Sequence, residues 1–150
     1  MNPGKYVVFG LGEERFALPI ENVQQILKSS KVTRIPRAPK DIVGLFSLRG
    51  TTIPIVDTSN VLSVPSNEKG YFLVASIDGV QAAFLVDQVH RIIDLGAEDI
   101  EATDDLADAK MSSHCGKTDE GLIVLLEPKA CIPMKEIKKA KATEAEALAA

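Results

Sequence analysis

Two stretches of the sequence share one pattern, and this repeat constrains the fold more than any other feature. Residues 6–26 and 71–92 each contain an apolar run, a turn with glycine, a second apolar run, an acidic residue, and a valine followed three positions later by isoleucine. The offset of about 65 residues is too long for a solenoid repeat and suits a duplicated small β unit. We therefore expect two related halves, with a chance match of short β segments as the alternative.

The rest of the chain is also divided into short apolar runs by turn-forming residues. Runs at 42–48 and 52–56 flank Arg49 and Gly50, a polar linker covers 63–70, and a last run covers 121–126. Such spacing, rich in Val, Ile and Leu, is typical of small barrels. Residues 96–117 are acidic and predict a long loop with a helical turn, whereas residues 135–150 predict a short helix that frays into solvent.

Composition excludes several classes of function. The 150 residues suit one domain or two very small ones, and the net charge of −4 disfavours a general nucleic-acid binder. Few aromatic residues are present to stack on bases. We see neither a secretory signal pattern nor an apolar stretch of about 20 residues, so we expect a reduced, cytoplasmic protein without membrane insertion.

Candidate catalytic and metal-binding motifs are weak. Gly10 and Gly12 follow a predicted strand, but a third glycine and a following helix are missing, so they predict a hairpin turn rather than a dinucleotide site. His114 and Cys115 are adjacent, which rarely places two side chains for proton transfer. With two histidines and no C-x-x-C motif, we expect no metal and no cofactor. A small hydrolase that uses His114, Cys115 and the acidic loop stays an alternative.

One apolar stripe suggests a surface for a partner. Ile20, Val23, Ile26 and Leu27 are spaced like one face of a helical turn. Core packing explains each of them separately, yet a small β unit has limited interior, so we expect part of the stripe to be exposed. Val7, on the preceding strand, is expected to lie beside it.

Arg49 raises a separate question, because it lies between two apolar runs and a guanidinium is costly to bury without a partner. A positive φ at Gly50 lets the chain turn, so that Arg49 projects outward while Leu48 and Ile53 point inward. Arg49 then either caps backbone carbonyls at this corner or contacts another protein, since arginine is common in interface hot spots.

These segments resemble the CheW family of bacterial chemotaxis coupling proteins. The resemblance is carried by the sequence GLFSLRGTTIPIVD at 44–57, by RIPRAP at 34–39 and LPIENVQQIL at 18–27 before it, by FLVDQV at 84–89, and by the strand at 121–126. It extends over residues 5–137.

The resemblance implies an all-β fold of two intertwined five-stranded SH3-like β-barrels, with short helical connections and a C-terminal helical tail. The pseudo-repeated subdomains would cover approximately 5–65 and 66–137, with strands exchanged between them, and the tail would cover 138–150. It also implies a non-catalytic adaptor, monomeric when isolated, that couples transmembrane chemoreceptors to a CheA-type histidine kinase in signalling arrays. A related coupling role in a pilus-driven or other kinase pathway is the alternative.

Carried over position by position, the resemblance implies two binding surfaces. The kinase-binding residues would be Val7, Ile20, Val23, Ile26 and, at a second contact, Leu106. The receptor-binding region would contain Arg49, with Gly44 and Ile92 near it.

Overall fold

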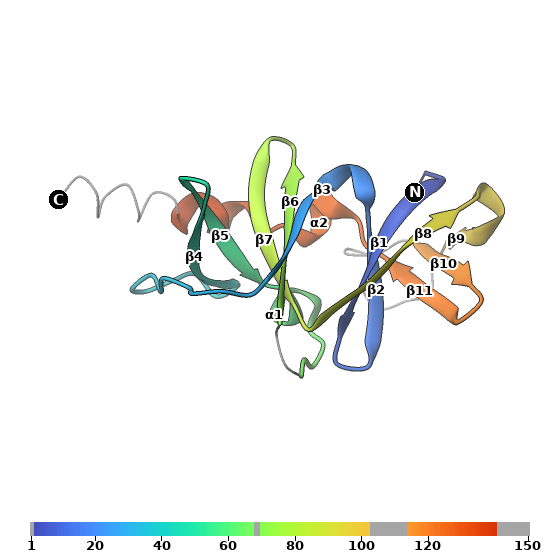
Figure 1. Ribbon diagram of the computed structural model, residues 1–150, viewed down its shortest axis with the longest axis horizontal. Coiled ribbons are helices and arrows are strands. Elements are labelled where there is room, and N and C mark those ends of the chain that lie inside the picture. The colour runs from blue at the N-terminus through green and yellow to red at the C-terminus, as the bar shows by residue number, and fades with distance from the viewer. Residues whose placement is uncertain (1, 68–69, 103–113, 141–150) are drawn as a thin grey trace.

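The computed structural model describes residues 2–67, 70–102 and 114–140, which form two curved β-sheets and a few short helical segments (Figure 1). The first sheet has the order β8-β1-β2-β11-β10-β9 and contains β1 (Gly4–Leu11), β2 (Glu14–Pro19), β8 (Gln88–Leu95), β9 (Ile100–Ala102), β10 (His114–Thr118) and β11 (Gly121–Leu125). The second sheet has the order β3-β6-β7-β5-β4 and contains β3 (Val23–Lys28), β4 (Ile42–Leu48), β5 (Thr51–Asp57), β6 (Tyr71–Ile77) and β7 (Val80–Val86).

The two sheets are built on the same plan. In each, a hairpin (β1–β2 or β6–β7) is flanked on one side by a strand from the other half of the chain (β8 or β3) and on the other by a second hairpin that pairs in parallel (β11–β10 or β5–β4). The predicted all-β, intertwined fold is therefore confirmed. The halves 5–65 and 66–137 do not each form one sheet, and the first sheet has six strands because the short β9 extends it.

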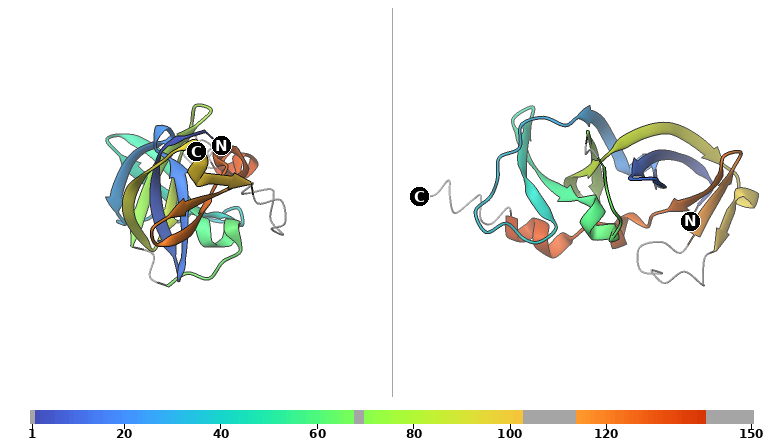
Figure 2. Two further views of the ribbon diagram at one scale, coloured as in Figure 1. Left: turned by 90° about the vertical axis from the view of Figure 1, so that its right-hand side faces the viewer. Right: turned by 90° about the horizontal axis from the view of Figure 1, so that it is seen from below.

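The chain passes between the sheets through very short connections (Figure 2). The 3-10 turn η1 (Ile20–Asn22) leads from β2 in the first sheet to β3 in the second. Asp87 alone separates β7 in the second sheet from β8 in the first. Because these connections are so short, the two sheets must lie close together.

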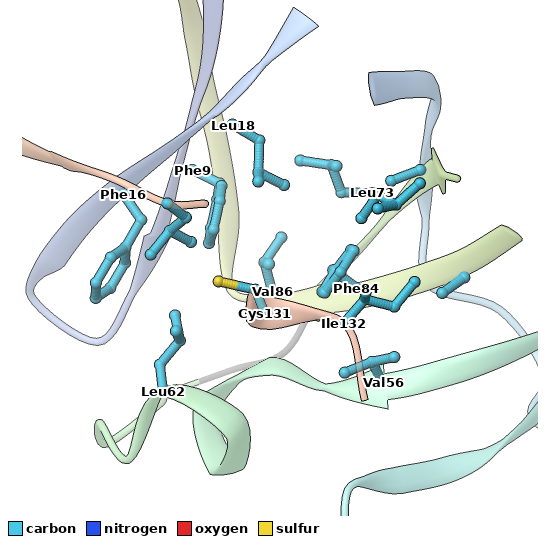
Figure 3. Close-up of a cluster of buried hydrophobic side chains, with 14 of the residues drawn as sticks. Phe9, Phe16, Leu18, Val56, Leu62, Leu73, Phe84, Val86, Cys131 and Ile132 are labelled. Carbon is cyan, nitrogen blue, oxygen red and sulfur yellow. The ribbon is translucent and has the colours of Figure 1, made fainter. Parts of the chain in front are cut away.

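The core has three parts. One cluster consists of side chains of the first sheet, among them Tyr6 and Leu125, and another consists of side chains of the second sheet, among them Phe46 and Phe72. The third combines residues of both sheets, such as Phe9 and Phe84, with residues outside the sheets, such as Leu62 and Ile132 (Figure 3). Helix α2 (Pro128–Cys131) contributes Cys131 to this cluster, where burial raises the pKa of the thiol to about 12.

One local prediction is wrong and two are correct only in part. Residues 23–28 form strand β3 rather than a helical turn, because they pair with β6. The loop expected at 96–117 contains a helical turn as predicted, η2 (Ala97–Asp99), but also β9 and the start of β10, and residues 103–113 lie outside the described residues. The predicted fraying helix is helical from 134 to 140, yet Ile137 and Ala140 are buried in the shared core, so its first part is anchored. The remaining helix, α1 (Thr58–Leu62), follows β5, and none of the helices in the described residues is long and apolar enough to span a membrane.

Candidate protein-binding surfaces

The predicted apolar stripe is divided by the alternation of β3. Ile26 points to solvent and is 41% exposed, and Ile20 on η1 is 37% exposed. Val23 is half-buried and packs against the shared core, whereas Leu27 packs inside the second sheet. The exposed part, called here the apolar patch, therefore consists of Ile20 and Ile26.

Val7 does not belong to this patch. Its side chain is 2% exposed because it packs into the core cluster shared by both sheets. The prediction that Val7 lies on an exposed contact surface beside the stripe is wrong.

A groove of about 580 Å³ borders the apolar patch, and we call it the junction groove because both sheets line it. It lies among the N-terminal end of β1, the turn η1, the β6–β7 turn and the start of α2. Ile20 lines it, together with Pro19, Ile77 and Pro128 and with the charged residues Lys5, Glu21, Asp78, Glu127 and Lys129. These residues come from distant parts of the sequence, so no local motif indicated the groove.

Arg49 lies where the sequence predicted it, at the tip of the β4–β5 hairpin. Leu48 pairs with Thr51, so Arg49 and Gly50 form a two-residue turn with φ values of 52° and 81°. This left-handed conformation is common for glycine and rare for arginine, for which it costs about 1–2 kcal/mol. Arg49 is exposed, and it has no ion-pair partner within the part of the chain that the structure describes.

Glutamine side chains accompany Arg49 at this end of the second sheet. A hollow of about 280 Å³ is lined by Arg49, Gln24, Gln25 and Gln81, among others. The Gln81 amide donates a hydrogen bond to the Gln24 side-chain oxygen at 2.8 Å. The guanidinium is thus next to amide groups that accept and donate hydrogen bonds, an arrangement suited to a polar partner. The two glutamines of β3 lie within the repeat pattern, but nothing in the sequence indicated that the start of β3 lies beside Arg49.

The other two predicted receptor-binding residues lie elsewhere. Gly44 is buried, and a Cβ atom added there would lie 2.5 Å from the Thr33 carbonyl oxygen, so it permits close packing and offers no side-chain contact. Ile92 is 53% exposed but belongs to β8 of the first sheet, whereas Arg49 belongs to the second. Gly44 therefore offers no side chain beside Arg49 and Ile92 lies on the other sheet, and their assignment to a receptor-binding region stays a prediction. Leu106 lies outside the described residues.

The candidate catalytic pair gains no support from its surroundings. His114 and Cys115 are neighbours on β10. Burial, and then the nearby Glu101, raise the pKa of the Cys115 thiol, which keeps it protonated and a poor nucleophile. Within 2–67, 70–102 and 114–140, no group of three or more His, Cys, Asp or Glu residues is placed to hold a metal ion.

An exposed ionic cluster on the first sheet was not evident from the sequence. Glu120, in the β10–β11 turn, pairs with Arg15 on β2 and with Arg91 on β8, the latter at 3.3 Å. The hydrogen bond from Arg15, together with Arg91, holds the pKa of Glu120 below its usual value. The His90 side chain packs against the backbone of Gly10, close to this cluster. Burial, and then Arg15, lower the pKa of His90.

Comparison with known proteins gives the family of this chain. Residues 5–136 match the sequence profile of the CheW-like domain. The chain belongs to the CheW-like domain family. The "Chemotaxis protein CheW" of Thermotoga maritima is 28% identical over 79% of this chain and 81% of its own length. The protein of the same name from Rhizobium meliloti is 32% identical over 67% of each chain.

A solved structure agrees with this CheW-like assignment. The crystal structure of the scaffolding protein TtCheW from Thermoanaerobacter tengcongensis superimposes with a TM-score of 0.77 at 31% sequence identity, covering 83% of this chain and 89% of that one. The agreement spans both sheets, since it includes most of the residues between the two ends of the domain.

Proposed function

We propose that this chain is a non-catalytic adaptor that couples transmembrane chemoreceptors to a CheA-type histidine kinase in chemotaxis arrays. The observation that carries the proposal is the match of the CheW-like domain to residues 5–136, which include nearly all the strands of both sheets. The relatives named above are chemotaxis proteins, and the match covers about two thirds or more of each relative's length. This favours a role in chemotaxis over one in a pilus-driven pathway. The adaptor would act in the cytoplasm, close to the receptor-containing membrane.

The two surfaces suit two different partners. The apolar patch of Ile20 and Ile26 would pack against an apolar surface of the kinase regulatory domain. Burying such partly exposed side chains contributes a few kcal/mol at about 25 cal/mol per Å², before the cost of association. This magnitude fits a weak contact that is strengthened by many copies in an array. The Arg49 hairpin would contact the receptor through its cationic tip.

The first test is the substitution Ile26→Asp. We expect binding to the kinase regulatory domain to weaken by about tenfold or more, because a carboxylate would have to be desolvated in an apolar contact. The fold should be unaffected, since Ile26 points to solvent. Titration calorimetry measures the affinity, and Leu122→Asp, at an exposed apolar residue on β11 of the first sheet, is the control. Unchanged kinase affinity in Ile26→Asp would remove the apolar patch from the proposal.

The second test is Arg49→Ala. We expect it to weaken binding to a receptor cytoplasmic fragment by about fivefold while leaving kinase affinity within about twofold, because a single exposed arginine in a polar contact contributes about 1 kcal/mol. Stability should change little, as the side chain has no ion pair among the described residues. Binding to the receptor fragment is measured by co-sedimentation. If the variant unfolds instead, Arg49 is a structural residue of the corner and the receptor assignment fails.

A further inference from the structure

The junction groove combines apolar walls with carboxylates that the chain leaves unpaired. Lys129 pairs with Asp78 at 3.7 Å, and Lys5 pairs with Asp94 outside the groove at 3.8 Å. Both ion pairs are highly exposed and contribute little. Glu21 and Glu127 remain, and neither has an ion-pair partner within the described residues. Three carboxylates and two lysines line the groove, and both lysines are paired, so the uncompensated charge is that of Glu21 and Glu127.

The side chain of Tyr6 lies within the electrostatic influence of both Glu21 and Glu127. Its ring is 2% exposed, and its hydroxyl donates a hydrogen bond to the Asn2 carbonyl oxygen at 2.5 Å. Burial raises the pKa of this hydroxyl, and Glu21 and Glu127 raise it further. Since Glu21 lies on η1 and Glu127 precedes α2, carboxylates from two distant segments create a negative potential over one side chain of the groove.

We propose that the junction groove receives a lysine or arginine side chain from the kinase segment that packs on the apolar patch. This inference rests on the proposed function, and it adds the chemistry of the partner. Ile20 belongs to both surfaces, so a segment that packs on Ile20 also reaches the edge of the groove. The aliphatic stem of the lysine or arginine would lie along Ile20 and Pro128, and its charged end would reach Glu21 and Glu127.

The experiment measures how salt affects the affinity of the full chain for the regulatory domain of the CheA-type kinase encoded in the same genome. Titrations are run in about 50 mM and about 300 mM NaCl, because exposed charges are screened over this range. The double variant Glu21→Gln/Glu127→Gln should bind about tenfold more weakly than the unmodified chain at low salt, and its affinity should depend less on salt.

A matched control separates a local effect from an effect of net charge. Glu13 and Glu14 lie at the β1–β2 turn, at the far ends of these two strands from η1 and the start of β1, which line the groove (Figure 1). The variant Glu13→Gln/Glu14→Gln loses the same two charges and should bind within about twofold of the unmodified chain. An equal loss in both double variants would overturn the inference.

The remaining outcomes distinguish a failure of the cationic contact from a failure of the proposed adaptor function. If Ile26→Asp weakens kinase binding but Glu21→Gln/Glu127→Gln changes neither the affinity nor its salt dependence, the proposed function stands and the cationic contact is overturned. If the unmodified chain does not bind the kinase domain at all, both are overturned.

Discussion

Replacing Ile137 by alanine is expected to lower the free energy of unfolding by about 3 kcal/mol, which is typical for removing a fully buried aliphatic side chain. Ile137 is 1% exposed and packs in the cluster shared by both sheets. It belongs to the helical segment 134–140, whose other buried residue in that cluster is Ala140. The segment is therefore anchored in the shared core rather than trailing into solvent.

Urea denaturation followed by circular dichroism measures this effect, since the chain has no tryptophan. Lys138→Ala is the control, because Lys138 is the exposed neighbour in the same helix and should change the free energy of unfolding by less than about 0.5 kcal/mol. Equal stabilities for the two variants would show that residues 134–140 do not contribute to the core in solution.

Replacing Asp87 by alanine is expected to cost about 2–3 kcal/mol, because two backbone N–H groups lose a charged acceptor. One Asp87 carboxylate oxygen accepts hydrogen bonds from the backbone N–H of Gly12 at 2.6 Å and of Asn67 at 2.7 Å. The carboxylate is 6% exposed and lies at the single-residue connection between the sheets. It therefore joins the β1–β2 turn and the linker between the chain halves to that connection.

Two comparisons make this second prediction specific. Asp87→Asn keeps an acceptor oxygen and should lose only about 1 kcal/mol. Asp94→Ala removes an aspartate whose ion pair with Lys5 is exposed, and should change stability by less than about 0.5 kcal/mol. If Asp87→Ala unfolds at the same urea concentration as Asp94→Ala, the hydrogen bonds of Asp87 do not stabilise the fold.

The sequence was most informative about strands and turns. Apolar runs bounded by glycine and by polar residues correspond to strands such as β4 and β5, and the positive φ predicted at Gly50 is observed. The repeat also has a structural counterpart, because β1–β2 leads into β3 just as β6–β7 leads into β8. These features depend on local chemistry, which a single sequence contains.

Exposure was predicted less well, because it depends on pairing between distant segments. Helical spacing suggested one stripe from Ile20 to Leu27, but pairing of β3 with β6 turned alternate residues to opposite faces. Val7 was predicted at the surface, although its side chain packs into a core cluster with residues as distant in sequence as Leu126. The junction groove likewise brings together Glu21 and Glu127, whose proximity no sequence pattern indicates.

The most direct test of an adaptor with two binding surfaces is co-sedimentation of the chain with a receptor cytoplasmic fragment and the CheA-type kinase. The chain should carry the kinase into the receptor pellet. With Ile26→Asp the chain should still reach the pellet but carry less kinase, and with Arg49→Ala the pelleted amounts of chain and kinase should fall together. Kinase that pellets equally well without the chain, or folded variants that each lose both partners, would contradict an adaptor with two separate surfaces.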